Sequence, residues 1–171
     1  LEYWELEQAK LKKSGSSPVM EGKVTLVTGV ASGIGKACVD KFLACGSVVV
    51  GLDINPKILD DKKLNYLPIV CDVNNTSQIR ESINLAIQHF GGIDCLVSNA
   101  GSFPASAKIE DLSDESLDQI LSMNLNSHVK LLRECIPFLK LGFDPSILVV
   151  GSKNVPAPGP GAGAYSMAKA A

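Results

Sequence analysis

The segment VTLVTGVASGIG, residues 24–35, determines the fold that we expect. It begins as a short run rich in Val and Leu, typical of a buried strand, and continues into KACVDKFLAC, which has the apolar spacing of a helix. Between them lie Gly29, Gly33 and Gly35. A strand, a glycine-rich turn and a helix N-terminus place unpaired backbone N–H groups where a pyrophosphate can bind. A purely structural turn is the alternative, and the position between strand and helix favours a dinucleotide.

The three glycines have different expected roles. Gly29 permits the tight turn, Gly33 lets the backbone approach the ligand, and Gly35 lets the helix pack close to the strand. The inner face of the helix is predicted to consist of Ile34, Ala37, Cys38, Phe42 and Leu43.

The rest of the chain repeats this alternation of strands and helices. Short runs rich in Val, Ile and Leu occur at 48–52, 67–70, 94–98 and 146–150, as expected for strands that are buried on both faces. Helical spacing appears at 76–90 and 113–139, with Ser113 as an N-cap followed by Asp114 and Glu115. The pattern predicts an α/β fold with a doubly wound parallel sheet, a Rossmann fold, over residues 20–171. Residues 1–19 are predicted to form a helix and a linker.

Composition narrows the range of possible partners. The 171 residues carry a formal charge of -2 and are 46% apolar, which suits one globular domain and no nucleic-acid partner. The apolar runs are too short to span a membrane and the N-terminus lacks a signal-peptide pattern, so a cytoplasmic location is expected. The five cysteines suit buried free thiols. With His89 and His128 as the only imidazoles, no metal site is expected.

Two acidic residues follow predicted strands. Asp53 ends the second strand, eighteen residues after Gly35, where its carboxylate can accept hydrogen bonds from both ribose hydroxyls and would repel a 2′-phosphate. NAD is therefore expected rather than NADP, although Lys57 lies close enough to weaken that repulsion. Asp53 could instead simply begin the turn that follows. Asp72 has the same two interpretations, turn former or acceptor for the adenine amino group.

Several further motifs occur in register. The sequence contains Thr28-Gly-x-x-x-Gly-Ile-Gly35, Asp72-Val73, Ser98-Asn99-Ala100-Gly101, Asn124, Ser152 and Tyr165-x-x-x-Lys169. Over roughly residues 20–171 it resembles the classical short-chain dehydrogenase/reductase family. The resemblance implies a set of residues that bind the dinucleotide: Gly29, Ser32, Gly33, Ile34, Gly35, Asp53, Asp72, Val73, Asn99, Ala100, Gly101, Tyr165 and Lys169. Ser98 departs from the family, which usually has Asn there; Asn99 and Gly101 are expected to carry that turn.

The catalytic chemistry can be argued from Tyr165 and Lys169. They are four residues apart on one predicted helix, and an ammonium beside a phenol favours the phenolate. In isolation such a pair is usually an amphipathic surface pair, but Ser152 at a strand end favours catalysis. Tyr165 would act as general base while a hydride moves to the nicotinamide, and Ser152 would hydrogen-bond the substrate oxygen. The resemblance implies that Lys169 also holds the nicotinamide ribose, and that Asn124 completes a water-mediated proton relay to Lys169.

The two ends of the chain carry a further resemblance. EYWELEQAKLKK and GSKNVPAPGPGAGAYSMAKAA are similar to the carboxy-terminal dehydrogenase domain of bacterial bifunctional aldolase/short-chain dehydrogenase proteins. That resemblance implies an upstream aldolase-like domain and a small alcohol or carbonyl substrate such as lactaldehyde. The chain starts at Leu1 and stops at Ala171 within a predicted helix, so we expect a C-terminally incomplete domain. The full-length protein is expected to be a homo-dimer or homo-tetramer. Alternatively, this fragment is an inactive dinucleotide-binding domain.

Overall fold

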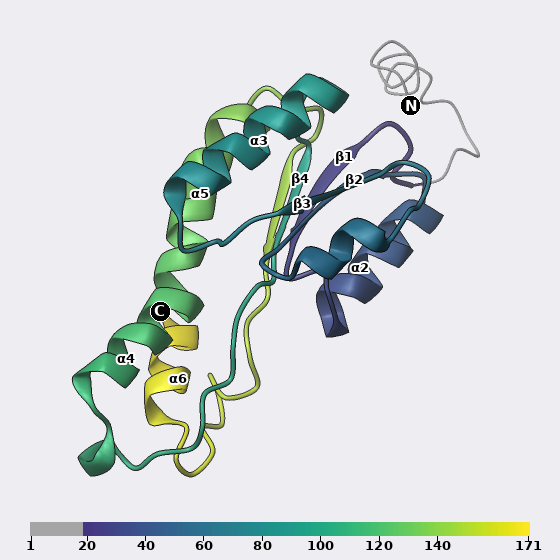
Figure 1. The fold of residues 1–171 in the computed structure, drawn as a ribbon. Coiled ribbons are helices and arrows are strands. Elements are labelled where there is room, and N and C mark those ends of the chain that lie inside the picture. The colour runs from purple at the N-terminus through teal and green to yellow at the C-terminus, as the bar shows by residue number, and fades with distance from the viewer. Residues whose placement is uncertain (1–18) are drawn as a thin grey trace.

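The computed structural model describes residues 19–171, which form a five-stranded parallel sheet between helices (Figure 1). The strand order is β3-β2-β1-β4-β5, and every pair of neighbours is parallel. This order confirms the predicted doubly wound fold. The strands lie within a residue or two of their predicted positions: β1 is Val24–Thr28, β2 Val48–Asp53, β3 Tyr66–Val70, β4 Cys95–Ser98 and β5 Ser146–Val149.

Helices cover both faces of the sheet. Helix α2 (Gly33–Ala44) packs on one face, and α3 (Thr76–Phe90) and α5 (Ser127–Leu139) lie side by side on the other (Figure 1). Helix α4 (Asp114–Leu121) packs against α6 (Gly163–Ala170) beyond the end of the sheet through Ile120, Ala164 and Ala168. Short 3₁₀ turns occur at Pro56–Asp60 and Ile109–Asp111. The carboxyl ends of the strands point toward α4 and α6 (Figure 1).

The buried face of α2 differs from the prediction. Ile34 and Ala37 are exposed, whereas Gly35 and Val39 are buried. The physical reason is the close approach of Gly35 to the carbonyl of Gly29, which sets the rotation of the helix about its axis. Ile34 is consequently turned outward, toward the carboxyl ends of the strands.

The predicted helix 113–139 is interrupted by a π-helical turn, Ser122–Asn126. The Ser127 N–H donates to the Ser122 carbonyl, one residue further back than in an α-helix. The Met123 carbonyl instead accepts the Ser127 hydroxyl at 2.6 Å. Such turns are frequent at functional sites, and this one contains Asn124. The predicted N-cap is confirmed, because the Ser113 hydroxyl accepts the Ser116 N–H at 3.2 Å.

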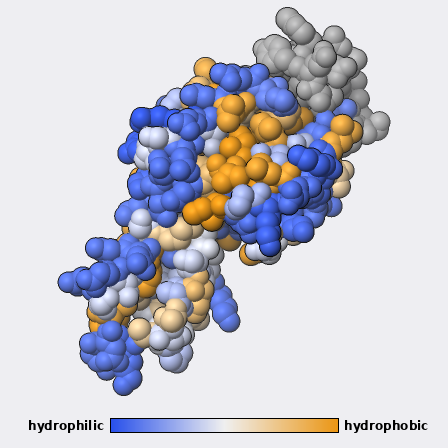
Figure 2. Space-filling view, viewed as in Figure 1, coloured by the Kyte–Doolittle hydropathy of each residue, from blue (hydrophilic) through white to orange (hydrophobic). Residues whose placement is uncertain are grey.

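Strand β5 is exposed, so the expectation that all strands are buried on both faces was wrong for it. Within residues 19–171 it lies at the edge of the sheet and pairs with β4, and Ile147, Leu148 and Val149 are each about half exposed. Edge strands of parallel sheets lose the cover that central strands receive. In the view of Figure 2, hydrophobic surface gathers at the level of the sheet, between the polar outer surfaces of the helices.

Three other expectations concern the N-terminal segment, the cysteines and membrane-spanning helices. The predicted N-terminal helix and most of the linker lie outside the described residues. Within the described part, all five cysteines are free, and Cys71, Cys95 and Cys135 are buried. Burial raises the pKa of the Cys135 thiol to about 12, which keeps it protonated and unreactive. None of the helices in residues 19–171 has the length and apolarity that crossing a bilayer requires.

Candidate active site

A cavity of about 590 Å³ opens at the carboxyl ends of β1, β2 and β4. In open α/β sheets this is the edge at which ligands bind. Most of the residues predicted to hold the dinucleotide line it: Gly29, Ser32, Gly33, Ile34, Asp53, Asp72, Val73, Asn99, Ala100 and Gly101. Leu52, Ile54, Cys71, Asn74 and Met123 complete the wall and were not singled out from the sequence.

The glycine turn is shaped as a cradle for a ligand. Gly29 and Gly33 have φ of 73° and 55°, in the left-handed region. A Cβ placed on Gly33 would meet nothing within 4 Å, whereas one on Gly35 would lie 2.0 Å from the Gly29 carbonyl oxygen. The side chain of Ser32 does not cap α2, and the first turn of α2 holds no acidic residue. The backbone N–H groups of that turn thus fit the pyrophosphate of a dinucleotide.

Thr28 joins the ends of β1 and β4, a role that the sequence did not reveal. Its buried hydroxyl accepts the N–H groups of Asn99 and Ala100 at 3.0 and 2.9 Å. In return, the Asn99 amide donates to the Thr28 carbonyl at 2.8 Å and to the Gly29 carbonyl at 3.3 Å. These bonds fix the floor of the cavity. The only sequence signal was the position of Thr28 directly before the first glycine.

Asp53 forms the turn that was one of its two interpretations, and it lines the cavity where the other, ribose binding, stays a prediction. One carboxylate oxygen accepts the Asn55 N–H at 2.9 Å, as in a turn, and the other accepts the Ala31 N–H of the glycine turn at 2.8 Å. Because a carboxylate has about four acceptor positions, lone pairs remain for ribose hydroxyls. Asp72 accepts the Asn74 N–H at 2.9 Å and also lines the cavity.

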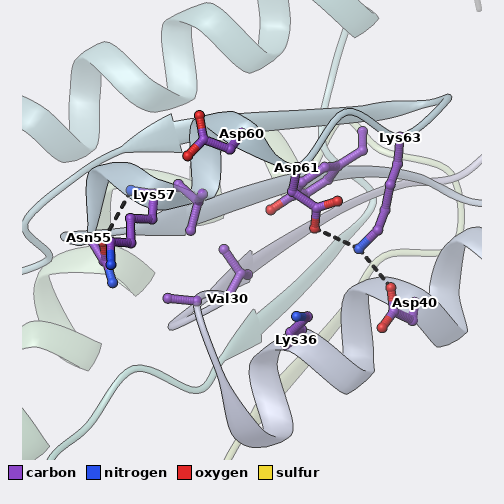
Figure 3. A pocket seen from close by; sticks show the side chains of 11 residues that line it. Val30, Lys36, Asp40, Asn55, Lys57, Asp60, Asp61 and Lys63 are labelled. Carbon is purple, nitrogen blue, oxygen red and sulfur yellow. Dashed lines mark hydrogen bonds and ion pairs between the residues drawn. The ribbon is translucent and has the colours of Figure 1, made fainter.

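A second cavity of about 610 Å³ lies on the other side of this turn, between α2 and the 3₁₀ turn that follows β2 (Figure 3). Its charges balance, with three lysines and three aspartates on its wall. Figure 3 shows the Lys63 ammonium between Asp40 and Asp61, at 2.8 and 2.6 Å. None of the glycines of the turn lines this cavity, so we do not assign the dinucleotide to it.

Helix α6 carries Tyr165 and Lys169 to the carboxyl end of the sheet. The Lys169 ammonium donates to the Val150 carbonyl, just beyond β5, at 3.0 Å. Burial lowers the pKa of this ammonium, which makes it a readier proton donor. The Tyr165 ring meets Phe103 edge to face, with 4.8 Å between ring centroids.

Asn124 is 2% exposed and lies close to Lys169. Its amide oxygen accepts the Ser102 N–H at 3.1 Å, and its amide nitrogen donates to the Ile120 carbonyl at 3.1 Å. A Cβ on Gly101 would lie 3.1 Å from this amide oxygen and 3.4 Å from the Lys169 Nζ. Gly101 therefore gives Asn124 and Lys169 room to approach each other.

Ser152 lies in the turn after β5, two residues beyond the carbonyl that binds Lys169. Its hydroxyl oxygen accepts the Asn154 N–H at 3.2 Å. Within residues 19–171, Ser152 does not hydrogen-bond to Tyr165. The structure thus brings Asn124, Lys169 and Gly101 together, whereas the Ser152 and Tyr165 hydroxyls do not hydrogen-bond to each other.

Ser98 and His128 form a buried pair that the sequence reasoning missed. The Ser98 hydroxyl oxygen lies 2.5 Å from the His128 Nδ1. Burial lowers the pKa of the imidazole, and the positive charge of Lys169 lowers it further; both effects favour the neutral ring. In the sequence, Ser98 stands out only as a departure from a family pattern. Its partner is thirty residues away, and no local pattern could identify it.

Known proteins resemble this chain over most of its length. The sequence model described as short chain dehydrogenase matches residues 23–171. Cis-2,3-dihydrobiphenyl-2,3-diol dehydrogenase of Paraburkholderia xenovorans is 34% identical over 128 residues, which cover 70% of this chain and 46% of that protein. The 3-oxoacyl-(acyl-carrier-protein) reductase of Thermotoga maritima is 34% identical over 158 residues, covering 88% of this chain and 64% of that protein.

Solved structures agree with this likeness. Ligand-free aldohexose dehydrogenase of Thermoplasma acidophilum superposes with a TM-score of 0.81 at 33% identity, covering 91% of this chain and 59% of that one. The 3-ketoacyl-(acyl-carrier-protein) reductase of Brucella melitensis, complexed with NADH, gives a TM-score of 0.83 at 28% identity, covering 88% and 65%. The chain thus spans about half to two thirds of the length of these relatives.

Proposed function

The chain belongs to the short chain dehydrogenase family, an oxidoreductase family, and from this we propose that it is an NAD-dependent enzyme acting on a small alcohol or carbonyl compound. The observation that carries the proposal is the placement of Lys169 and Asn124 at the same strand ends as the glycine-turn cavity. The glycine turn that would hold the nucleotide and the residues that would transfer protons therefore lie at the same edge of the sheet. The NADH in the Brucella melitensis relative supports the choice of cofactor class.

In the proposed mechanism, a bound nicotinamide supplies or accepts the hydride. During alcohol oxidation, Tyr165 accepts the substrate hydroxyl proton, and during carbonyl reduction it returns that proton. Ser152 donates a hydrogen bond to the substrate oxygen and stabilises charge that develops there. Burial lowers the pKa of the Lys169 ammonium. In the proposed mechanism this ammonium holds the nicotinamide ribose and passes protons on through a relay that Asn124 completes. Within residues 19–171 the Ser152 and Tyr165 hydroxyls do not hydrogen-bond to each other. Both therefore remain available to bind the substrate oxygen.

Asp53 is proposed to select NAD, and its substitution tests that selection. In Asp53→Asn, the repulsion of a 2′-phosphate disappears while one acceptor oxygen remains, so the ratio of NADPH to NADH affinity should rise about tenfold. The measurement is calorimetric titration with each cofactor. Asp60→Asn removes an equal charge from the neighbouring cavity and should leave the ratio unchanged. A ratio unaffected by Asp53→Asn, or equally affected by both changes, would show that Asp53 does not select the cofactor.

We propose further that the gene product joins an upstream aldolase-like domain to this one, acts on lactaldehyde or a related sugar-derived hydroxy compound, and functions in the cytoplasm as a homo-dimer or homo-tetramer. The proposal rests on the resemblance of the two end segments to such bifunctional proteins that the sequence analysis describes. An assay of the intact gene product with lactaldehyde and NAD should show NADH absorbance rising. Much faster turnover of unrelated hydroxy compounds would contradict it.

A second candidate function is dinucleotide binding without catalysis. It is favoured by the lining of the glycine-turn cavity, which includes most of the residues proposed to bind the dinucleotide but not Ser152, Tyr165 or Lys169. One experiment distinguishes catalysis from dinucleotide binding alone. Binding of NADH by the purified chain, with no turnover of any alcohol or aldehyde, would establish the second.

A further inference from the structure

The π-helical turn Ser122–Asn126 departs from the α-helical pairing on either side of it. Such a turn leaves a backbone carbonyl without its usual α-helical partner, so it needs support from other groups. Within the helix, the Ser127 hydroxyl donates to the carbonyl of Met123. Further support comes from outside the helix, from Asn74, a residue to which the proposed reaction gives no role.

Asn74 lies in the loop after β3 and contacts the π-helical turn with both polar atoms of its side chain. Its amide oxygen accepts the Ser122 hydroxyl at 2.9 Å, and its amide nitrogen lies 3.5 Å from the Met123 sulfur. Its backbone carbonyl accepts the Lys130 ammonium of α5 at 2.8 Å. We call these three contacts the Asn74 clamp. They join segments that are 48 to 56 residues apart in the sequence.

The loop that carries Asn74 is itself held in place. The Asn74 N–H donates to the Asp72 carboxylate at 2.9 Å, and the Asp72 N–H donates to the side-chain oxygen of Gln78 on α3 at 2.7 Å. Because the backbone at Asn74 is fixed in this way, little further conformational freedom is lost when its side chain binds the π-helical turn. Asn74 is therefore suited to hold that turn in one position.

The Asn74 clamp connects the wall of the dinucleotide cavity to Asn124. Asn74 and Met123 both line the cavity of the glycine turn, yet the side-chain oxygen and nitrogen of Asn74 are engaged by the π-helical turn. Asn124 directly follows Met123, and its amide oxygen accepts the Ser102 N–H at 3.1 Å. A shift of the π-helical turn would consequently displace the Asn124 amide from its partner.

We propose that Asn74 is a positioning residue, which holds the π-helical turn in register and thereby sets where the Asn124 amide lies in the candidate active site. The catalytic meaning of this inference rests on the proposed function, whereas its effect on the turn does not. Asn74 acts through Asn124 and not on the substrate. Without its side chain, the partly buried Ser122 hydroxyl loses its acceptor, and the turn becomes free to fluctuate.

The first test measures the turn itself and needs no turnover. Amide hydrogen exchange, followed by NMR, reports on the Ser127 N–H, which pairs with the Ser122 carbonyl, and on the Ser102 N–H, which donates to Asn124. In Asn74→Ala we expect both groups to exchange about tenfold faster, because a fluctuating turn opens them to solvent. Asn84→Ala removes the same side chain from an exposed position on α3 and should change neither rate.

Two further variants decide whether the hydrogen bond between Asn74 and Ser122 is responsible. Ser122→Ala removes that bond from its other end and should accelerate exchange at the same two N–H groups, even if Asn74→Ala does not fold. Asn74→Asp keeps an acceptor oxygen for the Ser122 hydroxyl and should hold both rates within about threefold of those in the unmodified chain. Unchanged exchange in the alanine variants, or acceleration that extends equally to β1, would overturn the proposal.

Turnover separates positioning from a general effect on stability. In Asn74→Ala, kcat should fall about fivefold to tenfold while KM and the affinity for NADH stay within about threefold, and Asn74→Asp should recover most of kcat. In a chain that already carries Asn124→Ala, the Asn74→Ala change should have no further effect on kcat, because it acts through Asn124. A loss of the same size in that background would refute the positioning role.

The two readouts also separate this proposal from the proposed function. If the unmodified chain shows no turnover, the proposed function fails, and hydrogen exchange still decides whether Asn74 holds the π-helical turn. If the unmodified chain turns over and Asn74→Ala matches its kcat, the positioning role alone is refuted.

Discussion

Replacing Gly35 with Ala is expected to abolish dinucleotide binding and to lower the free energy of unfolding by about 2–4 kcal/mol. The new Cβ would lie 2.0 Å from the Gly29 carbonyl oxygen and 2.7 Å from the Asn99 amide nitrogen. The first neighbour is backbone and cannot move aside without opening the turn. The second neighbour would lose its hydrogen bonds to the Thr28 and Gly29 carbonyls. Calorimetric titration with NADH and chemical denaturation measure the two effects.

Two other glycines serve as controls for that substitution. Gly33→Ala places a methyl group in open space at φ 55°, so it should cost only about 1–2 kcal/mol of stability while weakening NADH binding. Gly92→Ala meets nothing within 4 Å and lies away from the cavity, so both quantities should remain near those of the unmodified chain. Equal losses in Gly33→Ala and Gly35→Ala would show that close packing is not the role of Gly35.

The Tyr165→Phe variant is expected to lose at least about 10³-fold in kcat while keeping its affinity for NADH within about threefold. The substitution removes the hydroxyl that accepts and returns the substrate proton. It retains the ring, which packs against Phe103 and the small core shared by α4 and α6, so the fold should remain intact. Steady-state kinetics with the best available substrate and calorimetric titration with NADH measure the two quantities.

Tyr66 offers a matched control. It lies in the second cavity, and burial raises the pKa of its phenol to about 12, so it holds its proton throughout the neutral range. Tyr66→Phe removes the same hydroxyl outside the candidate site and should leave kcat nearly unchanged. Turnover that survives in Tyr165→Phe would remove Tyr165 from the role of general acid and base.

The fold could be predicted from the sequence because its signals are local. The composition of a run such as VTLVT predicts a buried strand. The glycine turn indicates that a strand precedes it and a helix follows it. The exposure of β5 was missed for the opposite reason. Its composition matches that of the central strands, and its exposure within residues 19–171 depends on the tertiary arrangement, in which it stands at one end of the sheet order.

The candidate site, like the fold, combines features that follow from local sequence with features that depend on tertiary contacts. The glycine turn and the motifs that follow the strands predicted most residues of the cavity wall, whereas Tyr165 and Lys169 of α6 do not line that cavity. The outward turn of Ile34 depends on a contact between Gly35 and Gly29, which periodicity alone does not contain. The Ser98 and His128 pair depends on packing between β4 and α5. Such long-range pairs arise from the tertiary structure.

The most direct test of the central claim is calorimetric titration of the purified chain with NADH and, separately, with NADPH. The proposed roles of Asp53, Tyr165 and Lys169 require that a nicotinamide dinucleotide binds at the glycine turn, with its adenosine ribose at Asp53. We predict saturable binding of one NADH per chain, at least about tenfold tighter than NADPH, and its loss in Gly35→Ala. The absence of NADH binding to a folded chain, or equal NADH affinity in the Gly35→Ala variant, would contradict the account.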